Sequence, residues 1–275
     1  MKKFLSMVLA LTMALSLVTV SAGAKDFTDS DEVTYKEAVD VVSELGIVDG
    51  YTDGSFNPTG TLTRGAAAKI ICNLILGPTT ADALSADTAP YSDVPTTNVF
   101  AGYIAYCQQQ GIISGYADGT FRPSATLTTY AFMKMLLGAL GYDSSIEGFT
   151  GANWSVQVAK LAMGIGLDDG NEDFVGVQAV TREEACLYAF NTLTADMVEY
   201  GSTTTVEVNG ATVVVGGSEA EKVYNAENRD YRLNEDNRDE YMQFCEEYFT
   251  DLELDDRDTE GDDFARPSNV WLNDD

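Results

Sequence analysis

Two arginines directly follow a threonine at the start of a segment with helical periodicity. Thr63-Arg64 and Thr181-Arg182 both precede apolar residues spaced three and four apart. Threonine in this place is typical of a helix N-cap. A helix N-terminus offers free N–H groups and a positive dipole end, and arginine adds a planar fork that fits a carboxylate. The pattern therefore predicts anion-binding positions at both arginines. A surface arginine paired with one of the chain's many carboxylates explains the same spacing, so both interpretations stay open.

The charge and the missing residue types exclude several classes of function. The 275 residues contain 16 Lys and Arg against 44 Asp and Glu, which gives a net charge of −28, and no histidine. Such a field repels nucleic acid and anionic membranes. The lack of histidine excludes the usual Ser-His-Asp and Cys-His catalysis. Glu183 and Glu184 are adjacent and cannot flank one glycosidic bond. We expect no enzyme activity, no cofactor and no metal site.

The chain contains an internal repeat that supplies the elements around these arginines. Gly46–Pro58 and Gly111–Pro123 share glycine, an apolar pair, Gly-Tyr, Asp-Gly, Phe and Pro at the same offsets, and each is followed by Leu-Thr. A third, eroded copy runs through residues 164–170 to Thr181, with a loop two residues shorter. Each copy predicts a helix, a tight loop and a second helix, and the three copies should share one core.

The loops of the first two copies each carry an Asp-Gly dipeptide. Asp53-Gly54 and Asp118-Gly119 are typical of turns, in which Asp accepts local N–H bonds and Gly supplies an unusual backbone angle. A calcium loop is the alternative, but the ladder of ligands ending in Glu that an EF-hand needs is missing. We interpret both dipeptides as turns. Gly46 is expected to end the first helix with a positive φ.

Four cysteines are spread along the chain without a CxxC spacing: Cys72, Cys107, Cys186 and Cys245. The first three lie within apolar helical patterns, which favours small buried hydrophobic side chains. Disulfides remain an alternative for an exported chain, and the sequence does not pair them.

Beyond Tyr200 the pattern changes. Residues 203–215 alternate around Asn209-Gly210, which predicts a β-hairpin. Residues 219–275 carry 20 acids and six bases, with one short apolar helical stripe that could dock on the bundle. Within it, residues 251–263 are expected to be a flexible acidic segment, either a solvated linker or a cation site.

The repeated pattern, Gly-Ile-Val/Ile-x-Gly-Tyr-x-Asp-Gly-Ser/Thr-Phe-x-Pro followed by Leu-Thr, resembles the S-layer homology family over residues 26–199. The resemblance implies a mainly α fold, with three helix-loop-helix repeats in a pseudo-threefold bundle, here followed by the β-hairpin and an acidic, partly helical tail. It also implies that grooves between repeats bind secondary cell-wall polysaccharide, whose pyruvylated sugars are anionic in many members.

The family's Thr-Arg-Ala-Glu motif, whose arginine reaches the acidic group of the ligand, carries over unevenly. The first copy keeps Thr63 and Arg64, and the third keeps Thr181 and Arg182. The second has Thr129 in place of arginine, which puts its groove in doubt. The expected polysaccharide-binding residues are Arg64, Arg182, Thr63, Thr181, Asp53, Gly54, Asp118, Gly119 and Trp154.

The family prefers an aromatic residue at the start of each first helix. Tyr35, Phe100 and Trp154 stand there in this chain. Stacking on a sugar and packing in the core are the two alternatives. Core packing is favoured for Tyr35 and Phe100, and both stay open for Trp154.

The expected division of the chain follows from these segments: 1–24 signal peptide, 26–78, 90–143 and 148–200 S-layer homology repeats, 201–218 β-hairpin, and 219–275 acidic segment. Lys2, Lys3, the apolar run to Val20 and Ala22-Gly23-Ala24 are typical of a secretory signal. A secreted, wall-bound protein with no membrane segment after signal removal is therefore expected.

Three functions compete. The first is noncovalent anchoring of a surface protein to cell-wall polysaccharide. The second is a self-assembling S-layer subunit, whose acidic tail binds divalent cations or neighbouring subunits. An exported wall enzyme ranks third, because no nucleophile, base or metal set is visible.

Overall fold

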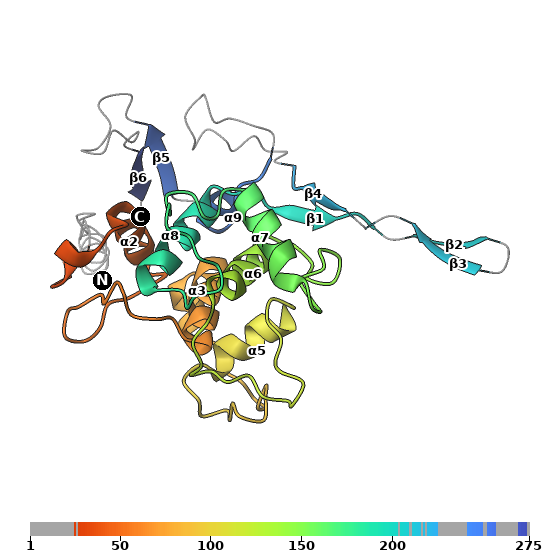
Figure 1. Ribbon diagram of the computed structural model, residues 1–275, viewed down its shortest axis with the longest axis horizontal. Helices are drawn as coiled ribbons and strands as arrows, with labels where there is room; N and C mark the ends of the chain where they lie inside the picture. The colour runs from red at the N-terminus through yellow and green to blue at the C-terminus, as the bar shows by residue number, and fades with distance from the viewer. Residues whose placement is uncertain are drawn as a thin grey trace, which may run out of the picture.

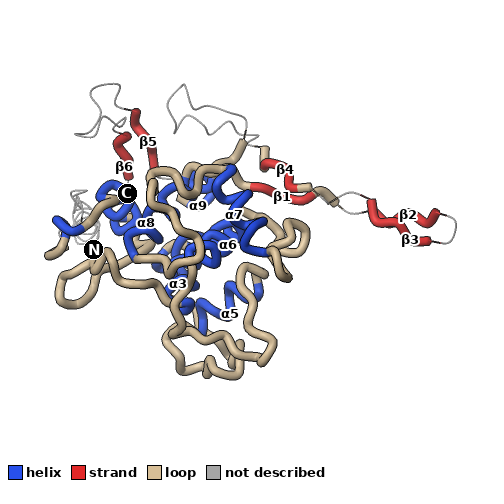
Figure 2. Tube along the Cα trace, viewed as in Figure 1, coloured by secondary structure: helices blue, strands red, loops and turns tan. Residues whose placement is uncertain are grey.

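A computed structural model describes residues 25, 27–202, 204–208, 211–215, 217, 219–224, 241–249, 252–256 and 269–273. The predicted signal segment 1–24 and much of the acidic tail lie outside these residues. Within them the chain is mostly helical (Figures 1 and 2). The helices are a short 3-10 turn η1 (Ser30–Glu32) and α2 (Lys36–Glu44), α3 (Arg64–Leu76), α4 (Pro78–Asp82), α5 (Ala101–Gln109), α6 (Thr129–Ala139), α7 (Trp154–Gly164), α8 (Arg182–Leu193) and α9 (Phe244–Tyr248).

The predicted helix pairs form, but their main packing partners belong to other repeats. The first helix of each repeat packs on the second helix of the repeat before it: α5 on α3, α7 on α6, and α2 on α8. The second helices also meet, α6 lying against both α3 and α8. One helix pair cannot bury both of its apolar faces alone, and this exchange of partners gives all three pairs one continuous core.

Short backbone bridges link the segments just before the second helices. Thr63 pairs with Thr126, Thr128 with Ala179, and Thr61 with Thr181. The first repeat is therefore bonded to the second, the second to the third, and the third back to the first. These bonds bring the starts of α3, α6 and α8 close to the loops of neighbouring repeats.

The local signals read from the sequence are confirmed. Thr63, Thr128 and Thr181 each accept a hydrogen bond from the backbone N–H three residues later, as N-caps do. Gly46 and Gly111 follow their helices with φ of 69° and 73°, a conformation that glycine adopts without strain. Helix α4, which follows α3 directly, was not predicted; Pro78 at its first position suits a helix start.

All four cysteines are buried and lie outside any disulfide, as expected of Cys72, Cys107 and Cys186 as small apolar side chains. The Sγ atoms of Cys72 and Cys107 lie 3.6 Å apart, where α3 packs on α5. Burial and this sulfur contact raise the pKa of Cys107, and burial raises the pKa of Cys186 to about 12. Such thiols stay protonated and unreactive near neutral pH.

The residues after α8 form short antiparallel pairs. Strands β1 (Val198–Tyr200) and β4 (Ala220–Lys222) pair with each other. The predicted hairpin is present as β2 (Thr204–Val208) and β3 (Ala211–Val215), and Figure 1 shows it projecting away from the helices. Helix α9 packs on α3 and α8, with Phe244 fully buried, so the predicted apolar stripe does dock on the bundle.

One expectation for the tail is wrong. Within the segment 251–263, expected to be flexible, residues 252–256 form strand β5 (Leu252–Asp256), which pairs with β6 (Asn269–Asn273). The register places Leu254 opposite Trp271. The alternation Leu-Glu-Leu-Asp is a strand pattern, which the high charge of the segment obscured.

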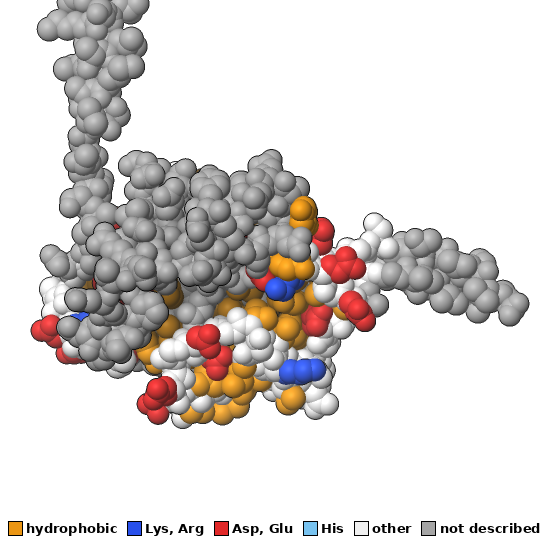
Figure 3. All heavy atoms as spheres, turned by 90° about the horizontal axis from the view of Figure 1, so that it is seen from above, with side chains coloured by type: hydrophobic (Ala, Val, Ile, Leu, Met, Phe, Trp, Pro, Cys, Tyr) orange, Lys and Arg blue, Asp and Glu red, His pale blue; other side chains and the backbone are white. Residues whose placement is uncertain are grey.

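The described surface is acidic, and Figure 3 shows carboxylate side chains at several separate places on the visible face. Among the described residues, no helix combines the length and apolar character needed to cross a membrane.

Candidate binding site

Each predicted arginine reaches across to the loop of another repeat. Arg64 donates from Nε to the carbonyl of Phe121 (2.8 Å) and from Nη2 to that of Ser114 (3.1 Å). Its guanidinium lies 4.3 Å from the ring centre of Phe121 and 5.2 Å from that of Tyr116. The contacts hold the arginine by backbone carbonyls and aromatic faces, and they leave three of its five N–H groups for other partners.

Arg182 repeats this arrangement on the loop of the first repeat. Its Nε donates to the carbonyl of Phe56 and its Nη2 to that of Asp49, both at 2.8 Å. The rings of Tyr51 and Phe56 both lie 4.8 Å from the guanidinium. Among the described ion pairs, neither Arg64 nor Arg182 is joined to a carboxylate.

The expected role of the helix N–H groups is wrong. The N–H groups of Arg64 and Gly65 donate to the carbonyls of Ala125 and Pro123 in the next loop, and Thr63 accepts the third. The first N–H groups of α8 are used in the same way. Those of Arg182 and Glu183 donate to the carbonyls at residues 60 and 58, and the third donates to the cap threonine. Packing between repeats thus uses the free donors that an isolated helix would offer to an anion. Any electrostatic attraction for an anion must therefore come from side chains.

The Asp-Gly dipeptides shape the loops, as expected for turns. Asp53 Oδ1 accepts bonds from the backbone N–H and the hydroxyl of Ser55, at 3.0 and 2.7 Å, and Gly54 has φ of 86°. Asp118 does the same for Thr120 and also pairs with Arg122 at 2.8 Å. These bonds hold the pKa of Asp118 at about 2. The carboxylates are thus engaged inside their own loops.

Two further aspartates support the loops, and sequence reasoning missed them. Asp29 accepts from the N–H groups of Phe56 and Asn57, and Asp93 from those of Phe121 and Arg122, all at 2.7 Å. Asn57 and Arg122 have φ of 57° and 60°, which is strained for residues other than glycine. The aspartates therefore hold the turn beside each aromatic residue that an arginine covers. The repeated Phe-Thr-Asp and Tyr-Ser-Asp, residues 27–29 and 91–93, were the available signal.

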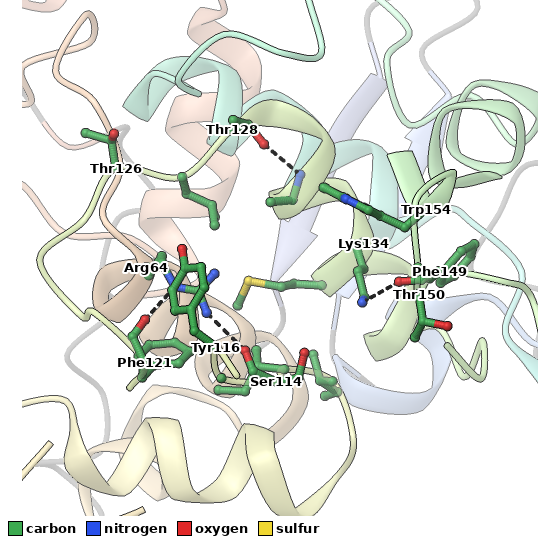
Figure 4. Close-up of a pocket in the computed structure, with 17 residues that line it drawn as sticks. Arg64, Ser114, Tyr116, Phe121, Thr126, Thr128, Lys134, Phe149, Thr150 and Trp154 are labelled. Carbon is green, nitrogen blue, oxygen red and sulfur yellow. Dashed lines mark hydrogen bonds between the residues drawn. The ribbon is translucent and has the colours of Figure 1, made fainter. Parts of the chain in front are cut away.

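A cavity of about 490 Å³ opens beside Arg64, at the meeting of the three repeats. We call it the arginine cavity. Figure 4 shows Arg64 and Tyr116 on one side and Lys134 and Trp154 on the other. Arg64 comes from the first repeat, Tyr116 and Lys134 from the second, and Trp154 from the third. Its full lining is Arg64, Ile112, Ile113, Ser114, Gly115, Tyr116, Phe121, Thr126, Leu127, Thr128, Ala131, Lys134, Met135, Phe149, Thr150, Gly151 and Trp154.

Among the described residues, no carboxylate lines the arginine cavity, although the chain carries 44 acids. Lys134, which sequence reasoning missed, donates to the carbonyl of Phe149 at 2.7 Å and lies 5.9 Å from the ring of Trp154. Burial and the charge of Arg64 lower its pKa. Burial likewise lowers the pKa of Arg64. Two partly desolvated cations thus face one cavity.

The other predicted residues lie elsewhere. Arg182, Thr181, Asp53 and Gly54 belong to the first loop and the start of α8, and Asp118 and Gly119 lie in the second loop without lining the cavity. Tyr35, Phe100 and Trp154 all pack against the core, and of the three only Trp154 also lines the cavity.

The second repeat lacks the arginine contact, as the sequence indicated. Thr129 is buried, with 1% of its surface exposed. The next residue, Tyr130, meets Phe174 of the third loop, with ring centres 5.8 Å apart. An aromatic pair thus occupies the place where the other two loops receive an arginine.

The acidic pair on α8 is structural. Glu183 is buried and accepts a bond from the backbone N–H of Thr34 at 2.7 Å. Glu184 completes a capping box with Thr181. Within the described residues, no group of three or more acidic or cysteine side chains is placed to hold a metal ion.

Comparison with known proteins gives consistent matches. The model of the S-layer homology domain family matches residues 26–68 and 90–128. The chain is 26% identical over 217 residues to a surface layer protein of Brevibacillus choshinensis, covering 78% of this chain and 19% of that protein. It is 40% identical over 88 residues to cell surface glycoprotein 1 of Acetivibrio thermocellus, covering 32% of this chain and 4% of that protein.

A third relative is named as an enzyme and not as a surface protein. It is an uncharacterized cell wall amidase of Bacillus anthracis, 26% identical over 179 residues, which cover 62% of this chain and 32% of the amidase. The chain therefore spans between a twenty-fifth and a third of the length of these three relatives. The family and the names indicate a secreted protein of the cell surface or cell wall. Residues 26–68 and 90–128, which carry the repeated motif, are thus matched by the S-layer homology domain family.

Proposed function

We propose that this chain anchors itself to the cell envelope by binding an anionic cell-wall polysaccharide, without catalysis, in the arginine cavity. The observation that carries the proposal is the charge of this cavity. The described residues of its lining include Arg64 and Lys134 and no carboxylate, within a chain whose net charge is −28. A cavity of that sign on so acidic a protein favours a ligand that is itself negative.

The chemistry of the lining fits an acidic sugar. A carboxylate between Arg64 and Lys134 would receive charge-assisted hydrogen bonds, each contributing about 1.5–3 kcal/mol. The half-buried face of Trp154 offers a surface for the C–H groups of a sugar ring. A pyruvylated sugar, which the family resemblance implies, carries such a carboxylate on its ring.

We infer that the repeats are related by a pseudo-threefold arrangement with unequal grooves. The cyclic exchange of helix partners and of backbone bridges supports it. Lysines follow the cap threonine by six residues in the first two repeats, at Lys69 and Lys134, but Leu187 stands there in the third. Lys69 is paired with Asp82 at 3.1 Å, so the lysine that corresponds to Lys134 in the first repeat is partly neutralised. We expect strong binding at Arg64, weaker binding at Arg182, and none beside Thr129.

Retention on purified, protein-free cell walls tests the proposal. Arg64→Ala and Lys134→Met should each weaken binding about tenfold or more, because each removes one charged contact. Lys160→Ala is the matched control, since Lys160 is exposed on the same helix as Trp154. Circular dichroism and the melting temperature would show that the variants fold.

The polysaccharide itself provides the second arm of the experiment. Mild acid, which removes ketal-linked pyruvate, should abolish retention of the unaltered chain if the carboxylate is the group recognised. Undiminished binding of a folded Arg64→Ala, Lys134→Met double variant would contradict the proposal. If binding survives removal of the acid groups, the carboxylate of the ligand is not the group recognised. That result would not contradict the arginine cavity as the binding site.

Assembly into an S-layer is the second candidate, and the name of the Brevibacillus relative favours it. It predicts ordered sheets in the presence of calcium without any wall, seen by electron microscopy. Hydrolysis of wall material, the activity in the name of the amidase relative, is not expected of this chain, because Glu183 and Glu184 are both engaged in structural bonds. Release of soluble wall fragments by the purified chain would overturn that expectation.

A further inference from the structure

Two asparagines perform the same structural task in the first and third repeats. Asn73 and Asn191 both stand ten residues after the cap threonine, at 63 and 181. The Nδ2 group of Asn73 donates to the carbonyls of Gly46 (3.3 Å) and Ile47 (2.9 Å). That of Asn191 donates to the carbonyls of Leu167 (3.1 Å) and Asp169 (2.9 Å). In both cases the amide satisfies carbonyl groups just beyond the first helix, which would otherwise lack partners.

The second repeat has a glycine at this position. Gly138 follows the cap residue Thr128 by the same ten positions and packs against Ile112. The carbonyls that correspond to those of Gly46 and Ile47 belong to Gly111 and Ile112. Within the described part of the chain, neither of these carbonyls has a hydrogen-bond donor. Because the second repeat has no asparagine at this position, the carbonyls of Gly111 and Ile112 lack the side-chain donor that the other two repeats provide.

A second cavity, of about 380 Å³, opens at this place and is lined by Gly111, Ile112 and Gly138. We call it the tyrosine cavity, because its walls include Tyr106, Tyr142, Tyr200 and Tyr248. These tyrosines come from α5, the segment after α6, β1 and α9. The cavity is thus completed by elements beyond the three helix pairs. It lies at the C-terminal end of α6, whereas the arginine cavity lies along the N-terminal part of that helix.

The described residues that line the tyrosine cavity include polar side chains and no cation. Gln110 and Ser144 supply neutral hydrogen-bonding groups, and Asp143 is the one acidic side chain. Tyr200 is fixed in place: its hydroxyl donates to Glu147 at 2.7 Å and accepts from the backbone N–H of Asp143 at 3.1 Å. Burial raises the pKa of all four tyrosines, so their rings stay neutral at physiological pH. A negatively charged ligand would find no cation here to pair with among the described residues.

We propose that the tyrosine cavity binds an uncharged sugar residue, whose hydroxyl or acetamido N–H groups donate to the carbonyls of Gly111 and Ile112. The ligand would take over the bonds that Asn73 and Asn191 make in the other repeats. Tyrosine rings suit the C–H faces of a sugar, and the amide of Gln110 and the hydroxyl of Ser144 suit its remaining hydroxyl groups. The site differs in charge from the arginine cavity, and Ile112 is the one described residue that lines both.

Nuclear magnetic resonance titration of the full chain, labelled with ¹⁵N, tests the proposal. The probes are the methyl β-glycosides of N-acetylglucosamine and of glucose, with methyl β-glucuronide as the charged comparison. The uncharged probes should shift the amide signals of Gly111 and Gly138, which line this cavity and not the arginine cavity, with a millimolar dissociation constant. No shift at these residues up to about 50 mM probe would overturn the proposal. Tighter binding of the glucuronide would also overturn it.

A substitution taken from the other repeats sharpens the test. Gly138→Asn should place an amide beside these carbonyls, as at positions 73 and 191, occupy part of the cavity, and weaken the uncharged probes at least tenfold. Its Cβ would lie 3.3–3.4 Å from Ile112, so that side chain must shift slightly, and the melting temperature shows whether the variant folds. Full binding by a folded Gly138→Asn variant would contradict the proposal. The titration of the unaltered chain decides the question even if this variant does not fold.

Arg64→Ala separates this site from the proposed function. That variant should lose retention on anionic walls and keep the shifts caused by the uncharged sugars. Loss of both in a folded protein would mean that the tyrosine cavity is not an independent site.

Discussion

Arg64 and Lys134 are held in different ways although they face one cavity. Arg64 lies between aromatic rings and two backbone carbonyls, whereas Lys134 has one carbonyl partner and lies over the ring of Trp154. Burial lowers the pKa of both side chains, which remain charged because their ordinary values are far above neutrality. A partly desolvated charge attracts an anion more strongly than one in water. The residues that fix these two side chains therefore matter as much as the charges themselves.

The cap threonines give a first prediction at this scale. Thr128→Ala should lower the free energy of unfolding by about 1 kcal/mol, because the N–H of Ala131 loses its acceptor. Urea denaturation measures the change. Thr128→Ser, which keeps the hydroxyl, should lie close to the unaltered protein, and equal loss in both variants would show that the methyl group matters instead.

The aspartates that hold the strained turns give a prediction for pH. Bonds from Phe56 and Asn57 hold the pKa of Asp29 below its usual value. A carboxylate with a lowered folded-state pKa stabilises the protein above its unfolded pKa of about 3.9, and that stability is lost as the pH falls through the folded value. We therefore expect the urea midpoint to fall as the pH drops below about 4, and to fall less in Asp29→Asn.

Asp31 provides the control for this measurement. It is exposed in the turn that follows Asp29 and does not bond to the loop of Phe56. Asp31→Asn should keep the acid sensitivity of the unaltered chain. An Asp29→Asn variant that loses stability in acid as steeply as the unaltered protein would refute the role given to Asp29.

Helix α9 shows how an element of the acidic tail becomes part of the bundle. It has only five residues, too few for stability by propensity alone. Its place is set by the buried side chains of Phe244 and Cys245 and by the bond from the N–H of Phe244 to the carbonyl of Ala195. The helix also brings Tyr248 to the tyrosine cavity.

Truncation of the buried aromatic residue tests this element. Phe244→Ala should cost about 3–5 kcal/mol, because it leaves a cavity between α9 and the helices beneath it. Glu247→Ala, on the exposed side of the same helix, should change stability by less than about 0.5 kcal/mol. Thermal unfolding of both variants provides the comparison, and a small effect of Phe244→Ala would mean that α9 is only loosely attached.

The electrostatic field of the whole molecule is negative, whereas its proposed binding site is positive. The net charge of −28 repels an anionic polymer at long range, while two cations attract it at contact. Repulsion of this kind slows the first encounter without weakening the final contacts to the same degree. Anchoring would then rely on several contacts along one polymer instead of fast capture.

This opposition predicts an unusual dependence on salt. Raising the ionic strength from about 0.01 M to about 0.15 M shortens the Debye length from about 30 to about 8 Å. The association rate on immobilised acidic polysaccharide should therefore rise severalfold, where an attractive field would make it fall. Surface plasmon resonance measures the rate, and a polymer whose acid groups are reduced to alcohols is the control. A rate that falls with salt would show that the local cations dominate the approach.

Much of the fold depends on local signals, and these the sequence determined by itself. Thr63 caps its helix, Gly46 ends one, and Asp53-Gly54 makes a turn, because each needs only a few neighbouring residues. The arginine positions could also be predicted from the sequence, because the repeated motif that contains them is a local signal. Residues 252–256 show the limit, since a strand that pairs across a long sequence gap leaves only a short pattern within a highly charged segment.

Tertiary structure decided what the predicted residues do. The first N–H groups of α3 appear free in a single repeat and are consumed only when the next repeat packs on them. Lys69 and Lys134 occupy equal places in their repeats, yet one is paired with Asp82 and the other lines a cavity beside Trp154. Gly138 looks like a weak point in a helix until the asparagine amides of the other two repeats show which bonds it leaves open. Contacts between residues far apart in the chain set these differences, and periodicity within one segment carries no record of them.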